Sequence, residues 1–170
     1  KGTAVVVLDT STRRGLVDSA YDERRAQCET AARVFGVKAL RDVNLAELEA
    51  RGTEMAPEVL RRARHIVSEN GRVLEAVAAM RGGETARIGG LFNASHASLR
   101  DDFEVTNEAL NTMAAIAQSQ PGCYGARMTG AGFGGCAVAL VDETAAGDFT
   151  AAVGAEYKRE TGLDAVVYVC

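Results

Sequence analysis

The segment Gly125-Ala-Arg-Met-Thr-Gly-Ala-Gly-Phe-Gly-Gly-Cys136, followed by Ala137-Val-Ala-Leu-Val141, decides the fold. Its glycines lie between two strand-like pieces, so it predicts a strand over 125–128, a connection over 129–135 and a buried strand over 136–141. Glycine permits positive φ, and consecutive N–H groups in such a loop can surround an anion. Because a strand follows the loop, it is neither a nucleoside-triphosphate loop nor a dinucleotide fingerprint. From spacing alone, a tight hairpin and an anion-binding loop remain equally good interpretations.

The rest of the chain supplies two further strands and several helices. A continuous apolar run predicts a strand over 5–9 and another over 163–170. Apolar residues at helical spacing predict helices over about 16–35, 45–51, 57–82, 84–99, 107–118 and 144–160. This order predicts an α+β fold, a ferredoxin-like split β-α-β-β-α-β sheet with inserted helices. We expect one domain over residues 1–170, with helices on one face of a four-stranded antiparallel sheet.

Composition excludes several classes of protein. The 170 residues are 47% hydrophobic and 25% charged, and the net charge of −4 argues against nucleic acid or anionic membranes as partners. The longest apolar runs are strand-length, far below the ~20 residues of a membrane span, and we identify no signal peptide. Four widely spaced cysteines indicate reduced thiols in a cytoplasmic protein. They lack zinc-ligand spacing, so we expect no metal site.

Other polar residues form three small groups. Arg13, Arg14 and Tyr21 surround the predicted loop after the first strand, where binding groups are common, but on these residues alone a partly buried tyrosine beside solvated arginines is the better interpretation. His65 and Glu69 lie four residues apart and can pair on one helix face. The adjacent residues of Ser95-His96 face different ways on a helix and form no triad. No general base, nucleophile or metal cluster can be assembled from these residues.

Four segments together resemble one known family. Gly125–Cys136 resembles the third motif of the GHMP small-molecule kinases, in its galactokinase form. The segments Leu16-Val-Asp-Ser-Ala-Tyr-Asp-Glu-Arg-Arg-Ala-Gln-Cys28-Glu, Arg61-Arg-Ala-Arg-His-Ile-Val-Ser-Glu-Asn70 and Ser95-His-Ala-Ser-Leu-Arg-Asp-Asp-Phe-Glu-Val105 continue the resemblance in the galactokinase order. It covers nearly the whole chain and only the C-terminal half of such an enzyme.

The resemblance implies ATP-dependent phosphorylation of galactose at its C1 hydroxyl. It places ATP and Mg²⁺ mainly on an N-terminal half that would be a partner of this domain, so we expect no catalytic residue and no activity in this chain alone. Asn111 departs from the pattern, which has an aspartate there. A silent sugar and nucleotide sensor, or a kinase for galacturonate or N-acetylgalactosamine, remain alternatives. The implied site residues are Tyr21 toward the sugar, Arg13 on the nucleotide side, and Arg127, Thr129, Gly130, Gly132, Gly134 and Gly135 in the glycine motif.

Overall fold

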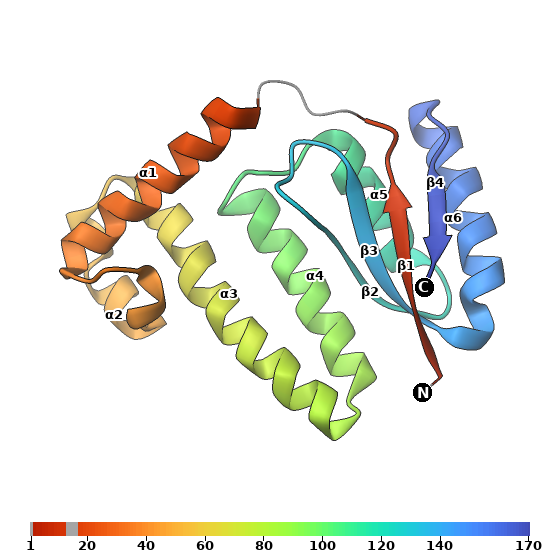
Figure 1. Ribbon diagram of the computed structural model, residues 1–170, viewed down its shortest axis with the longest axis horizontal. Helices are drawn as coiled ribbons and strands as arrows, with labels where there is room; N and C mark the ends of the chain where they lie inside the picture. The colour runs from red at the N-terminus through yellow and green to blue at the C-terminus, as the bar shows by residue number, and fades with distance from the viewer. Residues whose placement is uncertain (1, 13–16) are drawn as a thin grey trace.

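A four-stranded antiparallel sheet forms one side of the molecule, as the sequence predicts (Figure 1). The computed structural model describes residues 2–12 and 17–170. The strands are β1 (Thr3–Asp9), β2 (Cys123–Met128), β3 (Cys136–Asp142) and β4 (Val166–Val169), in the spatial order β2-β3-β1-β4. Val6 lies opposite Ala139 of β3 and Val169 of β4. The central strands are the two continuous apolar runs, which matches their burial between neighbours.

The helices follow the predicted order, and the structure adds short turns between them. They are α1 (Val17–Phe35), α2 (Leu45–Ala50), α3 (Pro57–Gly82), α4 (Thr85–Asp101), α5 (Glu108–Ser119) and α6 (Ala146–Thr161). Short 3₁₀ turns cover Leu40–Asp42, Gly52–Glu54 and Glu143–Ala145. The final strand is shorter than predicted because α6 ends on left-handed Gly162 (φ 76°) and the chain pairs only from Val166. Among the described helices, none has the length and apolar character that would let it cross a bilayer.

Three hydrophobic clusters hold these elements, and the smallest one, around Leu99 and Met128, lies between the two larger cores described next. Helices α5 and α6 lie behind the sheet (Figure 1) and fill its covered face with side chains such as Met113, Phe149 and Tyr157. A second cluster, which includes Leu48 and Ala63, joins α1, α2 and α3 at the other side of the molecule. The four cysteines are thiols, and none of them forms a disulfide in the structure. Helix α4 connects the two cores and therefore fixes how the sheet and the outer helices sit together.

Helix α4 runs along the outer edge of β2 and replaces a strand partner there. The N–H of Ala126 donates to Asn93 Oδ1 (2.9 Å), and the N–H of Met128 donates to His96 Nδ1 (3.1 Å). This approach requires a glycine, because a Cβ on Gly89 would lie 2.0 Å from the Tyr124 carbonyl oxygen. The side chains of α4 thus accept hydrogen bonds from edge N–H groups of β2 that would otherwise be open to pairing with another chain.

We expect Gly89→Ala to lower the free energy of unfolding by about 1–3 kcal/mol, because its methyl group would overlap backbone that cannot rotate away. Gly90→Ala is the matched control: its Cβ would meet nothing within 4 Å, so the higher helix propensity of alanine should stabilise the chain by roughly 0.5–1 kcal/mol. Urea unfolding of both variants measures the difference. Equal effects of the two substitutions would contradict the close approach of α4 to β2.

Candidate functional site

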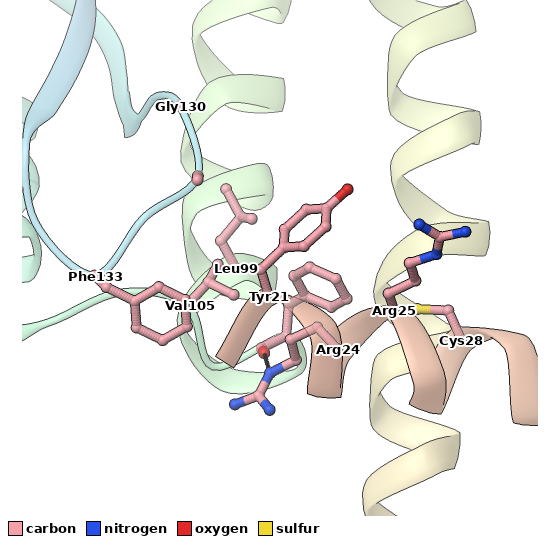
Figure 2. Close-up of a pocket in the computed structure, with 10 residues that line it drawn as sticks. Tyr21, Arg24, Arg25, Cys28, Leu99, Val105, Gly130 and Phe133 are labelled. Atoms are coloured by element: carbon pink, nitrogen blue, oxygen red, sulfur yellow. Dashed lines mark hydrogen bonds between the residues drawn. The ribbon is translucent and has the colours of Figure 1, made fainter. Parts of the chain in front are cut away.

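A pocket of about 350 Å³ opens between α1, the end of α4 and the glycine-rich loop. Figure 2 shows that residues far apart in sequence meet there. Tyr21 from α1 and Gly130 from the loop line the same pocket, so the structure brings together two of the residue groups that the sequence analysis singles out. The complete lining consists of Tyr21, Arg24, Arg25, Cys28, Leu99, Phe103, Val105, Gly130, Ala131 and Phe133.

Tyr21 presents its hydroxyl to open space. The side chain is 58% exposed, and the hydroxyl points away from Val105 and Phe133 in Figure 2. Among the described residues its hydroxyl has no hydrogen-bond partner. An exposed phenol hydroxyl at this position can donate to or accept from a polar ligand in the pocket. Its proposed contact with sugar stays a prediction.

The glycine-rich loop over 129–135 uses its glycines for conformations that other residues rarely adopt. Gly130, Gly132, Gly134 and Gly135 have φ values of +81°, +85°, +138° and +89°. The loop closes where the Thr129 N–H donates to the Cys136 carbonyl (2.9 Å). The loop is a hairpin connection and also reaches the pocket, and its interpretation as an anion-binding loop stays a prediction.

Gly130 and Ala131 form the exposed tip of this loop. Their N–H groups have no backbone acceptor within the described ranges 2–12 and 17–170. The tip can therefore donate to an anion that enters the pocket. Thr129 is exposed beside it, whereas Gly132 and Gly134 are buried behind it.

The other predicted residues lie elsewhere. Arg13 is outside the described residues. Arg127 does not line the pocket: its Nη1 donates to Glu69 Oε1 (3.0 Å), which also accepts from Ser95 Oγ (2.6 Å). Burial alone would raise the pKa of Glu69, but hydrogen bonds from Ser95 and Arg72 and the charge of Arg127 lower it. Arg127 therefore belongs to a hydrogen-bonded network with Glu69 and Ser95, and its role toward a ligand stays a prediction.

His65 contacts Ser98 and Phe103 rather than pairing with Glu69. His65 Nδ1 lies 3.0 Å from Ser98 Oγ, which donates to Asp102 Oδ2 (2.9 Å). Burial lowers the pKa of His65 to about 4, so the ring is neutral near pH 7. Because the Ser98 proton goes to the carboxylate, this chain of contacts does not activate a serine nucleophile.

His96 also serves packing, since its Nδ1 accepts the Met128 N–H. Burial, followed by the charges of Arg100 and Arg127, lowers the pKa of His96 to about 4, while the neighbouring Asn111 side chain raises it. Asn111, which departs from the galactokinase pattern, therefore lies beside His96 within this chain.

Sequence reasoning missed several residues that shape the pocket. Phe103, Val105 and Phe133 are ordinary apolar residues in the sequence, and Arg24 is one of many arginines. Burial raises the pKa of the Cys28 thiol, so this side chain contributes a neutral wall. The available signal was that all of these residues lie in segments that resemble the galactokinases. Within the described residues, no cluster of three or more His, Cys, Asp or Glu side chains could hold a metal ion.

Comparison with known proteins gives a consistent result. A family model described as GHMP kinases C terminal matches residues 73–159, just over half of the chain. The crystal structure of Lactococcus lactis galactokinase complexed with galactose is similar over 99% of this chain, with 40% identity and a TM-score of 0.95.

Two mevalonate kinases share the fold alone. The L. major enzyme in complex with R-mevalonate has 18% identity and a TM-score of 0.62 over 99% of this chain. The Methanococcus jannaschii enzyme has 16% identity and a TM-score of 0.56 over 100% of it. This chain spans 45%, 42% and 39% of the galactokinase and the two mevalonate kinases, respectively.

The two buried histidines predict acid sensitivity. Each has a folded pKa of about 4 against 6.5 as its ordinary value, so their contribution to stability is complete above 6.5 and declines as pH falls toward 4. We expect about 2 kcal/mol less unfolding free energy per histidine near pH 5 than near pH 7.5. Urea unfolding at both pH values measures this change.

The variant His96→Gln tests the assignment, because it removes one titrating group and should roughly halve the loss. Glu69 does not interfere, since its own ordinary pKa of 4.5 lies below this pH window and its lowered pKa acts only at more acid pH. A pH-independent stability across the window would refute neutral burial of the histidines.

Proposed function

The chain belongs to the GHMP kinases, and we propose that it forms the C-terminal half of a cytoplasmic galactokinase. The observation that carries this proposal is the pocket in which Tyr21 and the tip of the glycine-rich loop meet. The 40% identity with the L. lactis galactokinase, over nearly all of this chain, supports the choice of sugar kinase within the family. Four cysteines without a disulfide fit a reducing compartment.

The reaction proposed for the whole protein is a phosphoryl transfer. The oxygen of the galactose C1 hydroxyl forms a bond to the γ-phosphorus of ATP, the bond from that phosphorus to the bridging oxygen breaks, and ADP leaves with the electron pair. The hydroxyl proton passes to a base in the other half of the protein. Catalysis of this reaction depends mostly on positioning and on stabilising charge.

This chain supplies binding and positioning groups. The Tyr21 hydroxyl bonds a hydroxyl of the sugar, and the N–H groups of Gly130 and Ala131 face the phosphates. Leu99 and Phe103 give the pocket apolar walls that exclude water around these contacts. Arg13, close in sequence to the first strand, is assigned to the nucleotide side. Thr129, Gly132, Gly134 and Gly135 shape the loop, and we assign Arg127 to the same motif.

ATP and Mg²⁺ are shared unequally between the two halves in this proposal. The loop tip fits phosphate oxygens. From the resemblance to the galactokinases, we assign the metal, the base and most of the nucleotide site to the N-terminal half. The chain alone supplies one wall of the active site and is inactive, because binding energy divided across a cleft is lost with one wall.

The direct test is an assay of the full-length protein with ATP, Mg²⁺ and galactose, read as formation of ADP and galactose 1-phosphate. We expect turnover with galactose and much less with galacturonate or N-acetylgalactosamine. Absence of ADP above background with galactose would overturn the proposal. Turnover with another sugar alone would correct the substrate, and binding of both ligands without turnover would indicate a sensor.

Tyr21→Phe removes one hydrogen bond to the sugar in this proposal. We expect KM for galactose to rise about two- to twelvefold, which corresponds to ~0.5–1.5 kcal/mol, with a smaller change in kcat. Tyr168→Phe is the matched control, because Tyr168 is similarly exposed (55%) but lies on β4 and outside the pocket. Equal KM values for Tyr21→Phe and the wild type would remove Tyr21 from the site.

A further inference from the structure

The segment Asp102–Val105, here called the junction segment, forms a wall of the pocket. It follows α4 directly, and the Val105 N–H donates back to the Leu99 carbonyl (3.1 Å). Glu104 within this segment has φ +52°, a backbone conformation that residues other than glycine rarely adopt. This turn lets Phe103 and Val105 both line the pocket. A backbone conformation of this kind persists only where surrounding contacts stabilise it.

Two arginines from different helices bind successive carbonyl groups of the junction segment. Arg62 Nη1 of α3 donates to the Asp102 carbonyl (2.5 Å). Arg24 of α1 donates through Nε to the Phe103 carbonyl (2.7 Å) and through Nη2 to the Glu104 carbonyl (3.2 Å). The planar forks of these guanidinium groups fix the directions of the bonds as well as their lengths.

The side chain of Glu104 strengthens the same attachment. Its Oε2 accepts from Arg62 Nη2 (2.6 Å) and its Oε1 from Arg61 Nη2 (3.1 Å). The hydrogen bond from Arg62 lowers the pKa of Glu104, so the carboxylate is charged near neutral pH. Arg62 is only 3% exposed, and a buried guanidinium needs a charged partner. Arg62 thus holds both the backbone and the side chain of the junction segment.

The last carbonyl of the junction segment is bound to the glycine-rich loop. The Phe133 N–H donates to the Val105 carbonyl oxygen (2.7 Å), and a Cβ at Gly132 would lie 2.0 Å from that oxygen. Phe133 itself has φ +59°. The position of one carbonyl group therefore constrains a turn of the loop with positive φ, and that carbonyl belongs to the residue that follows Glu104.

We propose that Arg62 and Glu104 are positioning residues, which set the glycine-rich loop for phosphoryl transfer through the Val105 carbonyl. This inference rests on the proposed function. Neither side chain needs to touch substrate. Arg62 acts from α3, through the junction segment, on a loop whose tip faces the ligand. A small displacement of a binding group is enough to reduce turnover strongly, which is why such a distant pair matters.

The test uses Arg62→Lys and Glu104→Gln in the full-length protein. Lysine keeps the charge of Arg62 but cannot reproduce its fork, and glutamine keeps the shape of Glu104 without its charge. We expect kcat to fall on the order of tenfold to a hundredfold, with less than about a threefold change in KM for galactose. Hydrogen exchange in the peptide 129–135 should speed up on the order of tenfold for the protected amide of Phe133. The double variant should add little to either single variant.

Arg64→Lys and Glu49→Gln are the matched controls. Arg64 is also on α3 and makes a bidentate pair with a glutamate (2.7 and 2.9 Å), but this pair lies outside the pocket. A purely structural role for Arg62 predicts a lower melting temperature with kcat and the exchange of the Phe133 amide unchanged well below that temperature, and that result would overturn the proposal. If the wild type phosphorylates no sugar, the proposed function fails, while the exchange of peptide 129–135 still decides whether Arg62 and Glu104 position the loop.

Discussion

The contact between α4 and the edge of β2 is the constraint on which the rest of the structure depends. A sheet edge leaves N–H groups without partners, and Asn93 and His96 provide acceptors for two of them. These short polar side chains reach the strand only because Gly89 and Gly125 let the two backbones approach. Once α4 lies there, its C-terminal end is fixed beside the glycine-rich loop, and α3 packs against its outer side (Figure 1).

Two networks of polar contacts connect α4 and the segment after it to the neighbouring helices. In one, Glu69 of α3 joins Ser95 of α4 to Arg127 of β2, so a charged group inside the molecule is fully paired. In the other, the junction segment is bound by α1, by α3 and by the loop. The pocket lies where the second network ends. Its shape therefore depends on several elements at once rather than on the loop alone.

Much of the fold could be predicted from the sequence because the signals were local. Apolar runs marked the central strands, Pro57 marked the start of α3, and paired glycines marked its end. The order of elements then left few topologies, and the split arrangement is the one observed. The 3₁₀ turns were missed because three residues carry too little pattern, and the start of β4 was misplaced because pairing rather than composition sets it.

By itself the sequence determined the α+β class, the glycine-rich loop and the family resemblance, since these depend on residue type and order along the chain. Only the tertiary structure decided that Tyr21 and Gly130 share a pocket while Arg127 pairs with Glu69. It also decided which arginines hold the junction segment. The physical reason is that hydrogen bonds and close approaches join residues tens of positions apart, and their partners are set by the packing of α4 rather than by spacing in the chain.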